Sequence, residues 1–285
     1  MKNKKKVLLT LVSLTIGFIL FFYWQNNSIT THEIEFKNSD IPEAFEGFKI
    51  LHLSDLHNKE FGTKQDGLLT KIEHIDPDLI VITGDLIDSN RPNLDIAMDL
   101  IKEAINIAPI YYVSGNHEAW SGLYDELKNN LEANGVIVLD NQADEFHHHL
   151  DSIRIVGLSD PSFTERDWKD HNDSIPIEDT LSNLIEDDTT FTILLSHRPE
   201  LFEWYSKEKI DLVFSGHAHG GQIRIPFMGG LIAPNQGLFP SLTEGIHTKN
   251  NTSLIISRGL GNSIIPVRVF NSPELIVVTL SKNTK

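Results

Sequence analysis

The stretch that decides the fold is LHLSDLHNKEFG, residues 51–62. An apolar run typical of a buried strand ends at this point and is followed at once by Asp55 and His57. A single Asp-x-His is usually structural, with the aspartate capping a helix and the histidine at the surface. The rest of the chain therefore decides whether this pair has a chemical role.

Four later segments also place polar side chains directly after an apolar run. They are TGDLID with Asp85, SGNHEAW with Asn116 and His117, LLSHRPE with His197, and SGHAHGG with His217 and His219. In open α/β sheets, ligands bind at the edge formed by the carboxyl ends of the strands. Each segment alone could be a turn or a helix start, but five in succession predict one common site.

The residue types in these segments indicate a metal centre. Aspartate, asparagine and imidazole without sulfur suit a divalent ion such as Mn, Fe or Zn. The chain has no cysteine, which excludes disulfides, thiolate zinc sites and cysteine nucleophiles. The ligands are too many for one closed tetrahedral site, so we expect two ions, with Asp85 as the natural bridging carboxylate.

Strand and helix patterns alternate through most of the chain. This order predicts a layered α/β sandwich of two mixed sheets flanked by helices. The expected strands are FKILHLS, DLIVITG, PIYYVSG, SIRIVGL, FTILLS and DLVFSG, and the expected helices are LLTKIEHI, residues 97–105 and LYDELKNNLEANG. The last 65 residues look instead like β-hairpins, formed by GGQIRIP, SLIISRG, VRVF and ELIVVTL.

The N-terminus predicts a membrane anchor. Four lysines within residues 1–6 precede an uncharged apolar run, Val7–Trp24, which as a helix reaches roughly 27 Å and can just cross a bilayer core. A cleaved signal peptide is the alternative, although no small-x-small cleavage site follows the run. The expected organisation is a cytoplasmic tail (1–6), a transmembrane anchor (7–24), a spacer (25–45) and an extracytoplasmic domain (46–285).

The composition limits the classes of partner that the protein can bind. The chain is 40% hydrophobic and 22% charged, which is typical of a globular protein. Its formal charge of −16 argues against a protein that binds nucleic acid through phosphate contacts. Clustered carboxylates around cations would contribute to such a negative total.

The five motifs, in this order, resemble those of the calcineurin-like metallophosphoesterases. The resemblance covers about residues 47–282, and GHAHGGQIRIP with the late SRGLGNSIIPVRVFNSPELIVVTL is similar to the membrane-associated bacterial branch. The resemblance implies that Asp55, His57, Asp85 and His219 hold one ion, and that Asp85, Asn116, His197 and His217 hold the other. It places His117 beside the scissile phosphate. Ala218 stands where the family usually has threonine.

The resemblance also implies a reaction. Two divalent ions would activate a water as hydroxide for in-line attack on a phosphoester. Because the anchor places the site near lipid headgroups, we expect a phosphodiester of a lipid or cell-envelope substrate rather than a soluble nucleotide. We also expect hydrolysis of diesters rather than of monoesters. The alternative is a non-catalytic, membrane-anchored binding protein with a structural metal cluster. Arg198, next to His197, could contact phosphate, but we expect it to be exposed beside a proline turn. The apolar loop 225–232 could either meet acyl chains or pack on its own domain.

Overall fold

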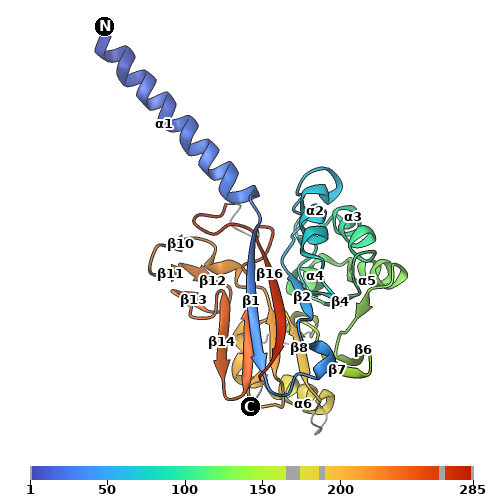
Figure 1. The fold of residues 1–285 in the computed structure, drawn as a ribbon. Coiled ribbons are helices and arrows are strands. Elements are labelled where there is room, and N and C mark those ends of the chain that lie inside the picture. The colour runs from blue at the N-terminus through green and yellow to red at the C-terminus, as the bar shows by residue number, and fades with distance from the viewer. Residues whose placement is uncertain (1, 165–173, 186–189, 263–266, 284–285) are drawn as a thin grey trace.

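The computed structural model describes residues 2–164, 174–185, 190–262 and 267–283. Two six-stranded sheets form its centre (Figure 1). The first has the order β1 (Thr30–Asn38), β16 (Glu274–Lys282), β2 (Lys49–Leu53), β3 (Leu79–Thr83), β4 (Ile110–Val113) and β5 (Ile137–Val138). The second has the order β14 (Gly245–Lys249), β15 (Thr252–Ile256), β9 (Leu212–Ser215), β8 (Thr192–Ser196), β7 (Asp151–Leu158) and β6 (Gln142–His148).

Both sheets are mixed. In the first sheet β2, β3, β4 and β5 are parallel, whereas β16 is antiparallel to β2 and parallel to β1. In the second sheet β7, β8, β9 and β15 are parallel, and the edge strands β6 and β14 are antiparallel to their neighbours. The predicted layered α/β sandwich is therefore confirmed.

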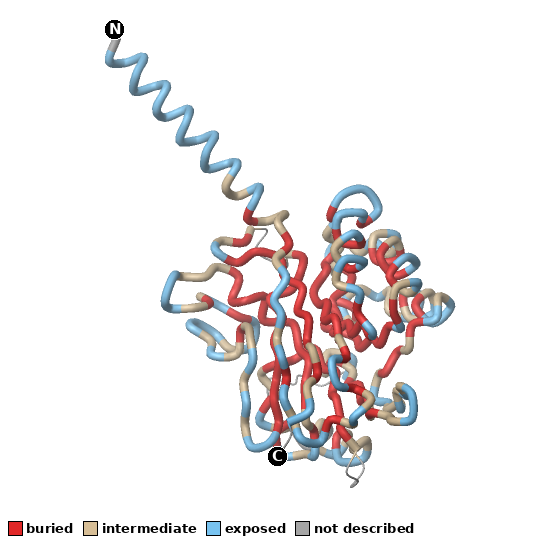
Figure 2. The backbone as a smooth tube through the Cα atoms, in the orientation of Figure 1, coloured by how far each residue is buried: buried red, intermediate tan, exposed pale blue. Residues whose placement is uncertain are grey.

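The central strands are apolar on both faces because each face is covered. In β3, Leu79 and Val81 face the layer between the sheets, whereas Ile80 and Ile82 face the outer helices. The outer helices on the first sheet are α2 (Asp66–Ile75), α3 (Leu94–Ala104) and α5 (Tyr124–Ala133), and those on the second are α6 (Ser174–Leu184) and α7 (Phe202–Tyr205). Figure 2 shows the resulting buried interior along the strands.

Short elements connect these layers. They are α4 (Asn116–Ser121) and the 3-10 turns Glu43–Phe45, Thr63–Gln65, Pro161–Phe163, Pro199–Leu201 and His219–Gly221. Two small hairpins follow the last of these turns. They pair β10 (Arg224–Ile225) with β11 (Gly229–Gly230), and β12 (Ile232–Ala233) with β13 (Gly237–Leu238).

The segment expected as a spacer, 25–45, instead contributes a strand to the domain. β1 pairs with β16 over nine positions, from Thr30 opposite Glu274 to Asn38 opposite Lys282. Phe36, Ile41 and Phe45 are buried between the sheets. The polar alternation of β1 arises because it is an edge strand with one exposed face.

The C-terminal region also differs from the expected series of hairpins. β14 and β15 do form a hairpin, but β16 crosses to the first sheet and lies between β1 and β2. In VRVF only Val269 makes a β-bridge, with Ile223. The apolar helix α1 (Lys2–Asn27) projects from the domain (Figure 1), and by length and composition it could cross a membrane.

The pairing of β1 predicts that the domain cannot be trimmed to residue 46. We expect the fragment 46–285 to unfold at a Tm at least about 10 °C below that of 28–285, because it loses two buried phenylalanines and exposes the edge of β16. Thermal unfolding of the two fragments measures this difference. Equal Tm values would show that β1 contributes nothing to the folded domain.

Candidate metal centre

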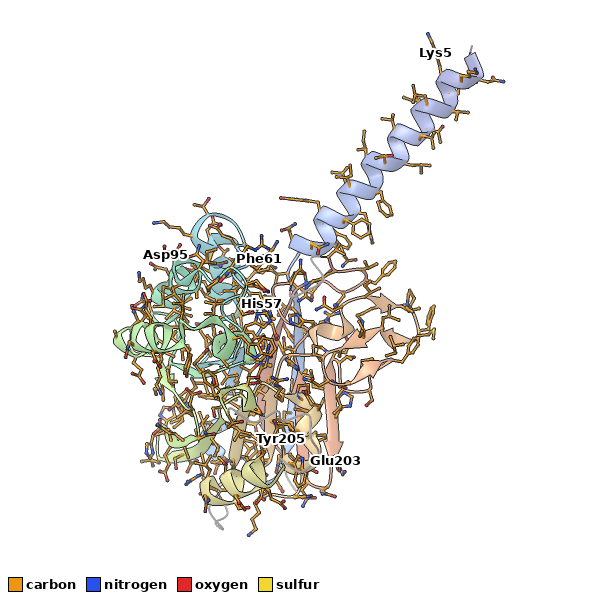
Figure 3. All side chains as sticks on the ribbon, turned by 180° about the vertical axis from the view of Figure 1, so that it is seen from behind. Lys5, His57, Phe61, Asp95, Glu203 and Tyr205 are labelled. Carbon is orange, nitrogen blue, oxygen red and sulfur yellow. The ribbon has the colours of Figure 1, made fainter. Side chains whose placement is uncertain are left out.

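The carboxyl ends of the strands of both sheets meet at one place, and the structure brings all seven predicted ligands there. Asp55 and His57 follow β2, Asp85 follows β3, Asn116 begins α4 after β4, His197 follows β8, and His217 and His219 follow β9. All seven are at least 94% buried. In Figure 3 His57 lies among packed side chains on the side of the domain where α1 joins it.

The first group consists of Asp55, His57, Asp85 and His219. The Nε2 atom of His57 lies 3.4 Å from Oδ2 of Asp85 and 3.7 Å from Oδ1 of Asp55. The Nε2 atom of His219 lies 3.2 Å from Oδ1 of Asp55 and 3.1 Å from Nε2 of His57. Two ring nitrogens and two carboxylates therefore face one small volume.

The second group consists of Asp85, His197 and His217, with the Asn116 amide beside them. The Nε2 atom of His197 lies 3.2 Å from Oδ2 of Asp85, 3.1 Å from Oδ1 of Asn116 and 3.1 Å from Nδ1 of His217. Asp85 belongs to both groups, and the same oxygen, Oδ2, faces His57 of the first and His197 of the second.

The hydrogen bonds of His197 show that these atoms fit a cation. Nδ1 lies 2.7 Å from the carbonyl oxygen of Thr83, which can only accept, so Nδ1 carries a proton. In neutral His197 the lone pair is then on Nε2, directed at the oxygens of Asp85 and Asn116. Either a second proton or a cation must lie between these acceptors, and Asp, Asn and imidazole ligands suit a divalent ion.

The charges of the side chains at the site support this fit. Burial disfavours a charged imidazole, but the Asp85 carboxylate outweighs burial and raises the pKa of His197 to about 10. Burial acts to raise the pKa of Asp85, yet the charges of His197 and His57 hold it well below its ordinary value. Burial lowers the pKa of His219 to about 3, which keeps that ring neutral and available as a ligand. A proton on His197 thus occupies the position that suits a metal ion.

The backbone at the site is strained. Asp55, His57, Asp85, His217 and His219 all have positive φ angles, between 46° and 64°. Non-glycine residues rarely adopt this conformation, and each instance costs about 1–3 kcal/mol. Asp55 and His57 are two residues apart, and with these φ angles their side chains point toward the same volume. Such strain persists only where neighbouring groups hold the loops in place.

The buried carboxylate of Glu118 supplies much of that support. It accepts hydrogen bonds from the backbone N–H groups of Asp85 (2.7 Å), Leu86 (2.8 Å), Ile87 (3.3 Å) and Gly115 (2.8 Å). Burial, reinforced by the charge of Asp85, raises the pKa of Glu118 to about 7. Glu118 directly follows His117 in SGNHEAW, but nothing in the local sequence indicates this supporting role.

Arg198 was expected at the surface, and this prediction is wrong. Its side chain is 2% exposed and forms a bidentate ion pair with Asp160, with Nε–Oδ2 at 2.6 Å and Nη2–Oδ1 at 2.9 Å. Its Nη1 donates to Nε2 of His217 at 2.9 Å. A charge that is paired in this way can be buried, and Asp160 lies 38 residues earlier, too far for local sequence to reveal the pair.

His117 lies beside the first group. Its backbone N–H donates to Oδ1 of Asp85 at 2.8 Å, and its ring centroid is 4.4 Å from that of His57. The Nδ1 atom accepts a hydrogen bond from the backbone N–H of Ser89 at 3.0 Å, so the neutral ring carries its proton on Nε2. His117 also forms a third group of possible ligands with His57 and Asp88.

Comparisons with known proteins agree with this arrangement. The sequence profile of the calcineurin-like phosphoesterases matches residues 48–221, which include every residue of both groups. The chain is 33% identical to the uncharacterised metallophosphoesterase YkuE of Bacillus subtilis, over 90% of this chain and 87% of that protein. It is 29% identical to the phosphodiesterase YaeI of Escherichia coli, over 82% of each chain.

A eukaryotic relative is also similar. A transmembrane protein with a metallophosphoesterase domain from Danio rerio is 25% identical, over 96% of this chain and 63% of that protein. The family match covers more than half of the chain, and the two buried ligand groups lie within it. The chain therefore belongs to the calcineurin-like phosphoesterase family.

Proposed function

We propose that this protein is a dinuclear-metal-dependent phosphodiesterase that is anchored in a membrane and acts on a lipid or cell-envelope substrate. The observation that carries the proposal is the presence of two buried ligand groups that share Asp85. Asp55, His57, Asp85 and His219 would hold one ion, and Asp85, Asn116, His197 and His217 the other. When bound, a pair of divalent ions polarises the phosphoryl group and lowers the pKa of a nucleophilic water.

His117 is the residue suited to act on the leaving group. The Ser89 N–H fixes the ring through Nδ1, so the neutral ring carries its N–H at Nε2. Burial lowers the pKa of His117, which keeps the ring neutral at ordinary pH. A neutral imidazole held beside the first ligand group can donate a hydrogen bond, or its proton, to a leaving oxygen as negative charge develops on it.

Two observations favour a diester substrate at a membrane. The relative YaeI is a phosphodiesterase. The apolar helix α1 suits a membrane anchor, and the relative from Danio rerio is a transmembrane protein. With its lysines in the cytoplasm, α1 would place the domain on the outer side of the membrane. The metal could be Mn, Fe or Zn, because the ligand set suits all three.

The shared position of Asp85 predicts unequal metal loss in two variants. We expect Asp85→Ala to lose both ions and Asp55→Ala to weaken mainly one, because only Asp85 contacts both groups. Elemental analysis of the purified full chain measures this, with Asp125→Ala on the surface of α5 as the control. Two equivalents of metal retained by Asp85→Ala would contradict the bridging role.

The reaction class predicts a preference for diesters. The full chain in detergent, loaded with Mn, should hydrolyse bis-p-nitrophenyl phosphate with a kcat/KM at least about tenfold above that for p-nitrophenyl phosphate. Asp85→Ala serves as the inactive control. Metal-loaded protein that hydrolyses neither ester nor any phospholipid would instead support a binding protein with a structural metal cluster.

The position of His117 predicts that its substitution lowers kcat by an amount that depends on the leaving group. We expect His117→Asn to keep its metal content but to lose about 10²–10⁴ in kcat with an alkyl leaving group, because positioned proton transfer contributes this much. The loss should be smaller with nitrophenolate, which needs no proton. His74→Asn, on the exposed side of α2, is the matched control. Unchanged turnover with both esters would remove His117 from the mechanism.

The lysines at the N-terminus predict that the domain lies on the outer side of the membrane. Protease added to cells that express the full chain, with any cell wall removed, should digest the domain and leave α1 protected. A cytoplasmic marker protein, which must stay intact, is the control. Complete protection of the domain would show the opposite orientation.

A further inference from the structure

The helix α1 does not end as a free tether, because its last turn is bonded to the domain. The side chain of Asn26 accepts from the backbone N–H of Arg268 at 2.8 Å and donates to the Arg268 carbonyl at 3.3 Å. Lys59 donates to Oδ1 of Asn27 at 2.7 Å, and Gln25 donates to the hydroxyl of Ser272. These contacts fix the direction in which α1 leaves the domain.

The same segment joins α1 to the two small hairpins. Phe270 contacts Phe21 of α1, with ring centroids 5.8 Å apart. Val269 forms a β-bridge with Ile223, and its carbonyl accepts from the N–H of Arg224 at 2.9 Å. Backbone bonds from Leu231 to Ile223 (2.8 Å) and from Phe239 to Leu231 (2.9 Å) connect the second hairpin. The hairpins therefore lie beside the base of α1 (Figure 1).

The hairpins expose large apolar side chains to an unusual degree. Outside α1, ten large apolar side chains are exposed among the described residues, and seven of them lie between residues 227 and 270. Phe227 is fully exposed at the turn between β10 and β11, and Met228, Leu238, Phe239 and Phe270 are more than half exposed. An exposed apolar cluster on a globular domain usually marks a binding surface.

The position of this cluster identifies what covers it. The apolar run of α1 ends at Tyr23 and Trp24, both exposed, which suit the interface between lipid and water. The hydrogen bonds to the domain begin at the next residue, Gln25, so with α1 inserted the domain would lie directly at the lipid surface. The exposed side chains of this cluster carry no charge, so the contact they can make is apolar rather than an attraction to anionic lipid.

We propose that the hairpins β10–β13, together with Phe270, form a second membrane-contacting surface, whose apolar side chains enter the lipid interface beside α1. This inference rests on the proposed insertion of α1 and does not depend on the reaction. The surface is tied to the metal centre, because Asn271 donates to the carbonyls of His219 (2.7 Å) and Gln222 (3.0 Å). The ligand loop is thereby held at a fixed place near the lipid headgroups.

Depth measurements on the full chain test the proposal. The chain has no cysteine, so a single Phe227→Cys or Leu238→Cys can carry a bimane label in nanodiscs of phosphatidylcholine. Leu150→Cys is the matched control, because Leu150 is also fully exposed but lies in the turn between β6 and β7, away from α1 (Figure 1). Leu14→Cys, within α1, reports insertion of the helix itself.

We expect doxyl-labelled lipid to lower the emission at positions 227 and 238 at least about twofold, and to leave position 150 unchanged. Aqueous iodide should quench the label at position 150 more than the labels at positions 227 and 238. Adding anionic lipid should not deepen the labels at 227 and 238.

Quenching at 227 and 238 that matches position 150, with Leu14→Cys quenched by lipid, would overturn the proposal and leave the anchor intact. An unquenched label at position 14 would overturn the anchor and the proposal together. Neither result bears on metal-dependent hydrolysis of a soluble diester, which tests the proposed reaction separately.

A double variant, Phe227→Ser/Met228→Ser, tests the same surface in a second way. It changes only exposed side chains, so its Tm should be unchanged. A label at position 238 in this background should lose about half of its quenching by lipid.

Discussion

The burial of two carboxylates, Asp55 and Asp85, among five histidine rings is the constraint on which the rest of this structure depends. A charge removed from water is costly unless opposite charge and hydrogen bonds surround it. Among the side chains themselves, protonated His197 compensates for part of the charge of Asp85, and the low pKa of His219 leaves that ring uncharged. Divalent ions would compensate more completely, and they would displace the proton from His197.

Holding these groups together requires support outside the ligand set. The five ligands with positive φ angles do not keep their conformation by local preference. Glu118 binds four backbone N–H groups around Asp85, and the Arg198–Asp160 pair holds the imidazole of His217. Rigid support of this kind is what positions a metal ligand to within a fraction of an ångström.

The sequence predicted the site better than its surroundings, for a physical reason. Parallel strands that are buried on both faces appear in the sequence as continuous apolar runs. Their carboxyl ends, and the ligands that follow them, can therefore be located from the local sequence alone. β1 was assigned to a spacer because its partner, β16, lies more than 230 residues away and its exposed face is polar. Arg198 was placed at the surface because an ion pair with Asp160 is visible only in three dimensions.

The strand order explains why the anchor and the metal centre share one end of the domain. β1 is parallel to β16, and β16 is antiparallel to β2, so β1 runs opposite to β2. The start of β1, which follows α1, therefore lies at the edge where β2 ends and Asp55 begins the ligand set. If β1 instead ran parallel to β2, α1 would leave from the opposite edge of the sheet, one strand length away. The nine-residue register of β1 with β16 thus determines that the ligand groups face the side of the domain from which α1 emerges.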